Sequence, residues 1–219
     1  MKVEKLITKE QPYDWFNIVT NECKGYPIHL VDIRDDELVV DIGANVGGFY
    51  EAWKHKFQKW VAVEASAWNC ELYKQNTGRD VEIHKAVWSK SGETLKLQGY
   101  KGDEQIDTPS GNFGVTEFVN ESNKHGWQGD YEEVQTISFE DLFGEDEIGL
   151  LKVDCEGAEY EFLYGKDVTK IKYIVIELHN FLGKDKHEKF MKWIEKTHEE
   201  IYTEGNGVDS HYVKLWRRK

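Results

Sequence analysis

Cysteine and proline are scarce in this 219-residue chain, with three residues of each. The cysteines, Cys23, Cys70 and Cys155, are odd in number, and no two have the spacing of a Cys-x-x-Cys pair. This pattern argues against a disulfide framework and against a zinc site built on paired cysteines. We therefore expect reduced cysteines that are buried in the fold.

Long apolar runs are absent as well. No stretch reaches the ~18 apolar residues typical of a membrane-spanning helix, and residues 1–10 lack the apolar centre of a secretion signal. We expect no membrane partner and no secretion, which leaves the cytoplasm as the predicted location.

Positive charge is also in short supply. Lysine and arginine number 28 against 41 aspartate and glutamate residues, which gives a formal net charge of −13. Because this excess opposes attraction to a phosphate backbone, nucleic acid is not an expected partner. The compact basic cluster at residues 217–219 is better explained as a solubilising tail.

The rest of the composition, with 39% hydrophobic and 13% aromatic residues, is that of a folded protein. The length suits one α/β domain, predicted over residues 38–219, and is short for two.

Residues 1–37 form an expected N-terminal extension. Apolar residues at helical spacing predict a helix over 12–23, which packs on the sheet or, alternatively, covers the ligand as a lid. Residues 28–33 suggest a short strand.

Residues 38–49 are the stretch around which the chain is organised. Four apolar residues surround Asp41 in a run too short for a helix, and the glycines that close it predict a buried parallel strand turning directly into a helix. Gly43 and Gly47 remove side chains where the backbone bends and where a ligand would lie. The following helix points free N–H groups at the same place, so the turn is a predicted ligand site.

Glu64 ends the next apolar run, residues 60–63. At the carboxyl end of a neighbouring strand, its carboxylate is placed to accept hydrogen bonds from both hydroxyls of a ribose. The ligand suggested is a nucleoside. The plainer interpretation is that Asp41 caps a turn and Glu64 is a solvated strand end.

The spacing of the turn narrows the ligand further. A dinucleotide fingerprint reads Gly-x-Gly-x-x-Gly, but Asn45 stands where the middle glycine would let the backbone approach a pyrophosphate. Asp41 adds a negative charge that disfavours a diphosphate and favours a cationic ligand. S-adenosylmethionine carries a sulfonium, an ammonium and a ribose, and so meets these requirements.

The remaining chain alternates between two kinds of segment. Apolar runs typical of strands lie over 81–88, 94–97, 134–139, 148–154 and 171–178. Segments typical of helices lie over 49–57, 67–75, 141–143 and 185–198. Near the end, the turn at residues 205–207 lies between segments 201–202 and 212–216, which predicts a closing antiparallel hairpin.

Residues 99–133 contain six glycines and no sustained periodicity, which predicts a long, loop-rich insertion on the substrate side. Within it, Asn112 and Phe113 are candidates for contact with the substrate, and Trp127 is a candidate aromatic wall. The alternative is a surface loop with no such role.

Four segments carry a resemblance to a known family: 41–47 (Asp-Ile-Gly-Ala-Asn-Val-Gly), 63–65 (Val-Glu-Ala), 151–159 (Leu-Lys-Val-Asp-Cys-Glu-Gly-Ala-Glu) and 174–177 (Ile-Val-Ile-Glu). They are similar to the FkbM-type methyltransferases, over roughly residues 38–180. The resemblance implies the Rossmann-like class I methyltransferase sandwich, an α/β fold with a mostly parallel seven-stranded sheet and a C-terminal antiparallel hairpin. It also implies S-adenosylmethionine as cofactor, S-adenosylhomocysteine as product, and transfer of methyl to a hydroxyl oxygen.

Residues of the motifs and strand ends are the expected cofactor contacts: Asp41, Gly43, Ala44, Asn45, Gly47, Glu64, Ala65, Ala86 and Asp154. Ala86 is included because the loop after the third strand meets the adenine in this fold. Related enzymes that act on nucleic acid carry Asn/Asp-Pro-Pro-aromatic or Pro-Cys motifs, in which none of the three prolines here lies. The expected acceptor is a hydroxyl of a sugar, glycan or small polar metabolite, and the family does not choose among them.

Methyl transfer requires an acceptor held about 3 Å from the methyl carbon and a group that removes its proton. Asp154, Glu177 and His179 follow two predicted strands at one rim. A histidine with a pKa near 6.5 and a carboxylate crowded by others both suit this task, with Glu177 orienting or sharing it. The plainer interpretations are a helix cap for Asp154, a backbone or Lys152 contact for Glu177, and a strand-end histidine for His179.

A divalent metal is a third option. Magnesium-dependent methyltransferases of similar fold bind the ion through oxygens at the ends of the same two strands, and here Asp154, Glu177 and Asn180 could supply them. Because the Glu-Gly-Ala-Glu segment departs from their pattern, no metal is assigned. Two other functions stay open: a nicotinamide-dependent oxidoreductase, which Asn45 and the acidic rim disfavour, and a nucleoside-binding module without turnover.

Overall fold

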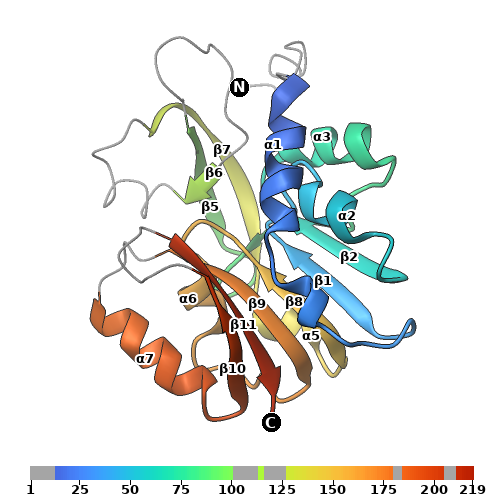
Figure 1. The fold of residues 1–219 in the computed structure, drawn as a ribbon. Helices are drawn as coiled ribbons and strands as arrows, with labels where there is room; N and C mark the ends of the chain where they lie inside the picture. Colours follow the sequence, from blue (N-terminus) through green and yellow to red (C-terminus); the bar gives the residue numbers. More distant parts are fainter. Residues whose placement is uncertain (1–12, 101–112, 116–126, 180–183, 205–210) are drawn as a thin grey trace.

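The computed structural model describes residues 13–100, 113–115, 127–179, 184–204 and 211–219. Its main sheet has the strand order β10-β11-β9-β8-β1-β2-β3 (Figure 1). The strands of this sheet are β1 (Leu38–Ile42), β2 (Lys59–Glu64), β3 (Ile83–His84), β8 (Ile148–Val153), β9 (Ile171–His179), β10 (His198–Thr203) and β11 (His211–Arg218). All neighbours from β9 to β3 are parallel, while β11 is antiparallel to both β9 and β10. The predicted mostly parallel seven-stranded sheet with a C-terminal antiparallel hairpin is confirmed.

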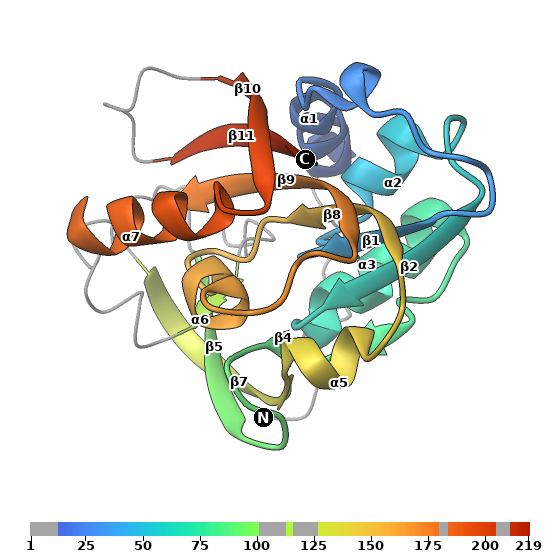
Figure 2. The same ribbon diagram turned by 90° about the horizontal axis from the view of Figure 1, so that it is seen from below.

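Helices cover both faces of this sheet (Figure 2). One face carries α1 (Tyr13–Lys24), α2 (Gly48–Trp53) and α3 (Ala67–Thr77), and the other carries α5 (Phe139–Phe143), α6 (Glu159–Leu163) and α7 (Lys184–Ile194). Because successive strand residues point to opposite faces, Val39 packs with Phe49 on the first side, and Val40 packs with Phe162 on the second. Burial on both faces explains why these strands are nearly continuous apolar runs.

A second sheet, of order β4-β7-β5-β6, lies beside the first. Its strands are β4 (Ala86–Val87), β5 (Thr94–Tyr100), β6 (Phe113–Val115) and β7 (Trp127–Ile137). The predicted single strand over 81–88 is therefore wrong, because the chain passes at Lys85 from one sheet to the other. The prediction of irregular structure over 99–133 is also wrong in part, since β6 and most of β7 lie inside that stretch and pair with β5.

Smaller differences have local causes. Residues 28–33 do not form a strand, because Ile28–Leu30 is a 3-10 helix, η2. Ile28 and Val31, three positions apart, are buried, which is helical spacing that the short apolar run concealed. The helix predicted to reach His198 ends at Ile194, since His198 already pairs with Arg218 in the hairpin. The cap predicted at Ser66 is present, and its Oγ accepts a hydrogen bond from Asn69 N at 3.4 Å.

The three cysteines are free, as predicted; Cys23 is buried, and Cys70 and Cys155 are partly exposed. Burial raises the pKa of the Cys23 thiol, which keeps it protonated and unreactive. No helix in the described ranges has the length and apolar character to cross a membrane. The cytoplasmic location stays a prediction from the sequence.

Candidate functional site

The loop after β1 bends sharply over the end of β8. Gly43 has a φ of +71°, and a Cβ on this residue would lie 1.7 Å from the carbonyl oxygen of Asp154. Both the conformation and the close approach therefore require glycine. Backbone N–H groups of Gly43 and Ala44 donate to Val63 O at 2.9 and 3.1 Å, which ties the loop to β2 as well. Gly47, with a φ of +93°, then leads into α2.

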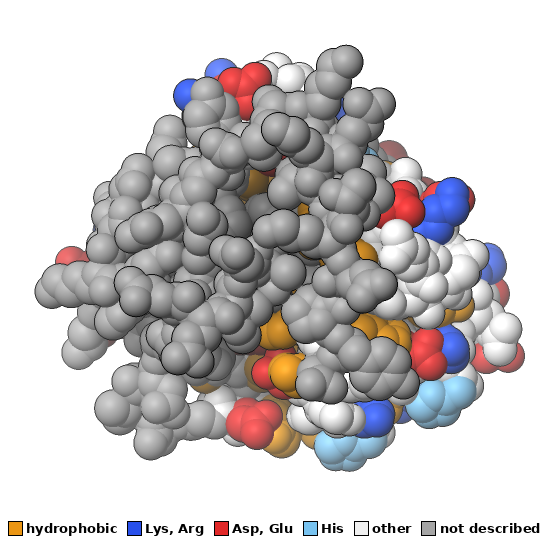
Figure 3. Space-filling view, turned by 90° about the horizontal axis from the view of Figure 1, so that it is seen from above, with side chains coloured by type: hydrophobic (Ala, Val, Ile, Leu, Met, Phe, Trp, Pro, Cys, Tyr) orange, Lys and Arg blue, Asp and Glu red, His pale blue; other side chains and the backbone are white. Residues whose placement is uncertain are grey.

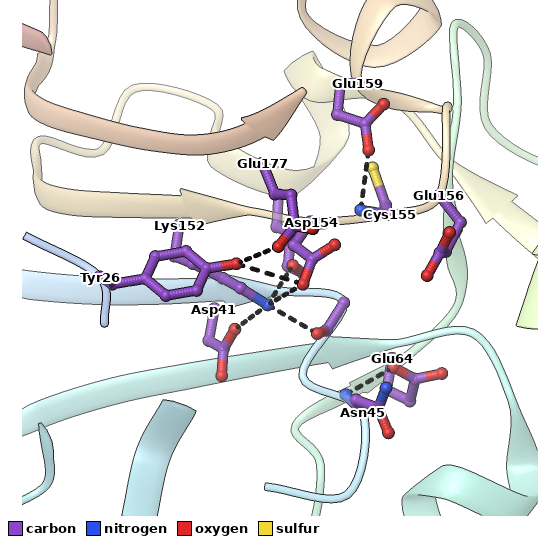
Figure 4. A network of polar contacts seen from close by, with 12 residues as sticks. Tyr26, Asp41, Asn45, Glu64, Lys152, Asp154, Cys155, Glu156, Glu159 and Glu177 are labelled. Carbon is purple, nitrogen blue, oxygen red and sulfur yellow. Dashed lines mark hydrogen bonds and ion pairs between the residues drawn. The ribbon is translucent and has the colours of Figure 1, made fainter. Parts of the chain in front are cut away.

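Glu64 is the last residue of β2, as the sequence predicts, and it lies against this loop (Figure 4). Asn45 N donates to its Oε2 and Ser66 N to its Oε1, both at 2.8 Å. Glu64 is 6% exposed, and burial raises its pKa although these backbone N–H groups oppose the shift. Oε1 also accepts a hydrogen bond from Asn69 Nδ2 at 3.4 Å, whereas Oε2 accepts the one from Asn45 N, so Oε2 has a lone pair with which it could accept a hydrogen bond from a ribose hydroxyl.

The other expected contacts with the nucleoside lie around the start of α3. The carbonyl oxygen of Ala65 contacts His84 Nε2 at 3.0 Å, and Ala86 is buried at the start of β4. Glu132 of β7, which no sequence pattern marked, accepts a hydrogen bond from Ala67 N at 2.8 Å. The second sheet thus closes over the N-terminus of α3.

The expected substrate contacts are placed only in part. Asn112 lies outside the described residues. Phe113, in β6, pairs through its backbone with Gly99 of β5, and Trp127, at the start of β7, pairs with Tyr100 of β5. The side chains of Phe113 and Trp127 lie outside the described part of the structure. Their contact with a substrate stays a prediction.

Strand alternation directs three charged side chains to one face of the main sheet. Asp41, Lys152 and Glu177 each lie two positions after a residue that packs on the α1 and α2 side, namely Val39, Leu150 and Val175. Their carboxylate and ammonium groups therefore meet between the sheet and the N-terminal helices (Figure 4). This is the central polar cluster of the site.

Lys152 neutralises Asp41 inside the protein. Lys152 Nζ lies 3.1 Å from Asp41 Oδ1 and 3.6 Å from Asp154 Oδ2, and it donates to Gly43 O at 2.8 Å. Burial alone would lower the pKa of Lys152, but Asp41 and Asp154 raise it, so the amine stays charged. Asp41 is 1% exposed. The expectation that its charge faces a cationic ligand is corrected here, because its nearest cation is Lys152.

His179 is held between two carboxylates. Its Nδ1 lies 3.0 Å from Glu159 Oε1 and its Nε2 lies 3.3 Å from Glu156 Oε2. Burial would lower the pKa of His179, but these two carboxylates raise it well above 6.5. At neutral pH the ring therefore carries protons on both nitrogens and cannot accept another. This environment does not favour His179 as the base, and its catalytic role stays a prediction from the sequence.

Glu177 has the properties expected of a base. Burial, followed by the nearby charge of Asp154, raises the pKa of Glu177 to about 7. Tyr26 donates a hydrogen bond to Glu177 Oε2 at 2.8 Å and lies 3.4 Å from Asp154 Oδ2. Asp154 and Glu177 thus come together as predicted, and they share a tyrosine that the sequence did not reveal.

A divalent cation could be held by Asp154, Glu156 and His179, whose ligand atoms all lie within 4.8 Å of one another. This set differs from the one considered in the sequence, in which Glu177 and Asn180 joined Asp154. Asn180 lies outside the described residues. Because His179 must lose a proton before it can coordinate, a cation there would compete with the ion pairs to Glu156 and Glu159.

Figure 3 views the molecule from above, toward the carboxyl ends of the parallel strands. Hydrophobic side chains of the described residues gather near the middle of this view, and basic and acidic side chains lie next to each other along its border. Charges of both signs are thus mixed on the part of this face that the structure describes. A phosphate backbone would favour one continuous basic surface.

A mostly parallel sheet with a glycine loop after β1, an acidic end on β2 and acids at the ends of β8 and β9 defines a Rossmann-like α/β protein. The family model described as "Methyltransferase FkbM domain" matches residues 41–203, well over half of the chain. The chain belongs to the FkbM methyltransferase family.

Several solved structures are similar in outline. TrmK of M. capricolum with S-adenosylhomocysteine has 11% sequence identity and a TM-score of 0.45, over 93% of this chain and 67% of that one. The N-methyltransferase NodS of Bradyrhizobium japonicum, also with S-adenosylhomocysteine, has 11% identity and a TM-score of 0.45, over 98% and 95%. The mitomycin 7-O-methyltransferase MmcR has 13% identity and a TM-score of 0.41, over 93% and 54%. These likenesses are remote, and no substrate is inferred from them. No curated protein matches the chain.

Proposed function

We propose that the protein is an S-adenosylmethionine-dependent methyltransferase that transfers a methyl group to a hydroxyl oxygen of a sugar or another small polar metabolite. Membership of the FkbM family supports the class of reaction. The observation that carries the finer assignment is the carboxylate of Glu177, whose pKa of about 7 suits it to remove a hydroxyl proton.

The charge balance of the site supports a cationic cofactor. Among the described residues of the candidate site, six carboxylates accompany two cations, Lys152 and His179. The carboxylates are those of Asp41, Glu64, Asp154, Glu156, Glu159 and Glu177. An excess of negative charge favours a ligand with a sulfonium and an ammonium, and opposes the pyrophosphate of a nicotinamide dinucleotide. This favours methyl transfer over hydride transfer.

The roles of the residues follow from their positions. Glu64, which lies against the loop from Gly43 to Gly47, would bind the ribose hydroxyls, and the loop would contact the nucleoside. S-adenosylmethionine, when bound, supplies an electrophilic methyl group on a good leaving group. Glu177 would accept the proton that the acceptor hydroxyl loses as its oxygen takes the methyl group and S-adenosylhomocysteine leaves. Asp154 lies beside Glu177 and keeps its pKa high.

A hydroxyl acceptor fits this arrangement better than an amine. An alcohol must lose its proton during the transfer, which requires a base at the acceptor. A neutral amine can attack before it loses a proton, so a carboxylate with a pKa near 7 is less necessary for it. Glu177, next to Asp154 and Tyr26, therefore favours oxygen over nitrogen.

Binding and turnover test the proposal separately. In titration calorimetry we expect S-adenosylmethionine and S-adenosylhomocysteine to bind, and NAD⁺ and NADP⁺ to give no heat. We then expect label from methyl-labelled S-adenosylmethionine in hydroxylated sugars or metabolites, and none in amine analogues of the same compounds. Binding without transfer across the acceptor panel would favour the nucleoside-binding module, and binding of a nicotinamide cofactor alone would favour the oxidoreductase.

A further inference from the structure

Tyr26 reaches the site from the N-terminal segment, which precedes the part of the chain that the family model matches. It lies in a tight turn between α1 and η2, where Tyr26 N donates to Cys23 O at 3.3 Å and Ile28 N donates to Tyr26 O at 2.8 Å. From this turn its side chain points at the carboxylates of Glu177 and Asp154 (Figure 4). A segment outside the matched region thus supplies a polar group to the candidate site.

Packing fixes the turn that carries Tyr26. Trp53 Nε1 of α2 donates to Cys23 O at 2.8 Å, and the Tyr26 ring packs edge-on against Phe49 with centroids 5.6 Å apart. The two N-terminal helices approach so closely that a Cβ on Gly48 would lie 2.6 Å from Val19 Cγ1. Tyr26 is 5% exposed. Its hydroxyl is therefore held in place by several independent contacts.

The hydroxyl acts mainly on Glu177. Tyr26 has a single O–H proton, and Glu177 Oε2 at 2.8 Å is much closer to it than Asp154 Oδ2 at 3.4 Å. Burial, followed by the charges of Asp154 and Glu177, raises the pKa of Tyr26 well above 10. The phenol therefore keeps its proton and serves as a hydrogen-bond donor to the carboxylate.

We propose that Tyr26 is a positioning residue of the methyl-transfer reaction, which holds the Glu177 carboxylate and stabilises its ionised form, so that the N-terminal segment completes the active site. This inference rests on the proposed function, because it assigns Tyr26 a role through the base of that reaction. It gives residues 13–31 a part in catalysis rather than in packing alone.

The hydrogen bond has a measurable electrostatic effect. A donor to a carboxylate favours its charged form, so the Tyr26 hydroxyl lowers the pKa of Glu177, against burial and Asp154, which raise it. Removal of the hydroxyl should raise the pKa of Glu177 by about one unit. The acidic limb of the rate profile should then move to higher pH by the same amount.

Tyr26→Phe tests the proposal, with Tyr173→Phe as the matched control. Tyr173 is also 5% exposed and belongs to the same hydrophobic cluster, and it precedes Glu177 on β9. The titration of Glu177 is followed by carbon-13 NMR of its labelled carboxyl group, assigned with Glu177→Gln, and kcat is measured against pH. We expect Tyr26→Phe to move the midpoint of the Glu177 titration and the acidic limb of the kcat profile to higher pH by about one unit. At pH values below that limb, kcat should fall about tenfold, and the Kd of S-adenosylmethionine should change less than twofold. Tyr173→Phe should shift neither curve.

A second measurement separates positioning from folding. In a Glu177→Gln background, Tyr26→Phe should lower the residual rate no further, because the residue through which it acts is already changed. An additional loss there, or an unchanged NMR titration in an active enzyme, would overturn the Tyr26 assignment alone. If the wild-type protein transfers no methyl group to any acceptor, the proposed function fails and the role of Tyr26 fails with it.

Discussion

Lys152 Nζ lies 3.1 Å from Asp41 Oδ1, and both side chains are almost completely buried, with exposed fractions of 2% and 1%. Within the described residues, Asp41 Oδ2 has no hydrogen-bond partner, so Lys152 is the main compensation for a buried charge. The same ammonium group donates to the carbonyl oxygens of Ile42 and Gly43 at 3.2 and 2.8 Å. One buried lysine thus balances an acid on β1 and holds the loop that follows it.

Lys152→Met should strongly destabilise the protein, because it leaves the carboxylate of Asp41 buried without its partner. We expect the free energy of unfolding, measured with urea at pH 7, to fall by about 3–5 kcal/mol. Lys172→Met is the control, since Lys172 pairs with Glu37 at 3.4 Å but is 33% exposed. That change should lower the free energy by less than about 1 kcal/mol. Equal effects of the two variants would contradict the importance given to the buried pair.

Gly43→Ala tests the close approach between the loop and β8. A Cβ at Gly43 would lie 1.7 Å from the carbonyl oxygen of Asp154, so the backbone must move. Gly78 has nearly the same φ, +72°, with nothing within 4 Å of its would-be Cβ. We expect Gly78→Ala to lower the unfolding free energy by about 1–2 kcal/mol, the strain of the left-handed conformation. Gly43→Ala should lose clearly more and weaken the binding of S-adenosylmethionine. Similar losses would show that conformation alone matters.

Local patterns in the sequence were enough to predict the main sheet. Apolar runs that end in Asp41, Glu64 or Asp154, each followed by glycine or a helix cap, specify strand, turn and helix within about a dozen residues. The second sheet was missed because β7 is defined by its pairing with β5, whose partner residues lie 27 to 41 positions away in the chain, and not by alternation of its own. Long-range pairing of this kind leaves little trace in a single segment.

The site was predicted to the extent that it consists of strand ends. Asp154 and Glu177 came together, and Glu64 lies at the same edge of the sheet, because the carboxyl ends of parallel strands share one rim. Tyr26 could not be found in this way, since it lies 151 positions from Glu177 and meets it only through the packing of α1 on α2. The protonation of His179 was also missed, because it depends on carboxylates whose positions follow from the turn after β8.

Asp154→Asn should slow turnover and move the pH profile in the direction opposite to Tyr26→Phe. The negative charge of Asp154 helps raise the pKa of Glu177, so its removal should lower that pKa and shift the acidic limb of kcat to lower pH. We expect kcat at pH 8 to fall at least tenfold while the thermal midpoint stays within a few degrees. Asp167→Asn, at an exposed turn where Thr169 donates to the carboxylate, is the control. Wild-type kcat in Asp154→Asn would limit Asp154 to a structural role.

Glu64→Ala should weaken the binding of S-adenosylmethionine, because it removes the acceptor for the ribose hydroxyls and releases Asn45 N and Ser66 N. We expect the Kd from titration calorimetry to rise about 10- to 100-fold. Glu64→Gln, which keeps the shape but not the charge, should give an intermediate value. Glu71→Ala, at a partly exposed position on α3, is the control and should leave the Kd unchanged. Unaltered affinity in Glu64→Ala would remove the ribose assignment.

The raised pKa of Glu177 also predicts how stability varies with pH. Its pKa rises from the ordinary 4.5 to about 7 on folding, so between these values the folded protein keeps a proton that the unfolded chain has released. The contribution of Glu177 to the free energy of unfolding therefore falls as pH rises from about 4.5 to 7 and is constant above that window. Glu177→Gln removes this loss, and the stability of the variant relative to wild type should increase across the window in urea titrations.

Glu145→Gln supplies the opposite sign, because a hydrogen bond from Lys170 lowers the pKa of Glu145 and its contribution is lost as pH falls. A difference between Glu177→Gln and wild type that does not vary from pH 4.5 to 7 would mean that Glu177 titrates at its ordinary value and is ionised too readily to act as the base proposed here.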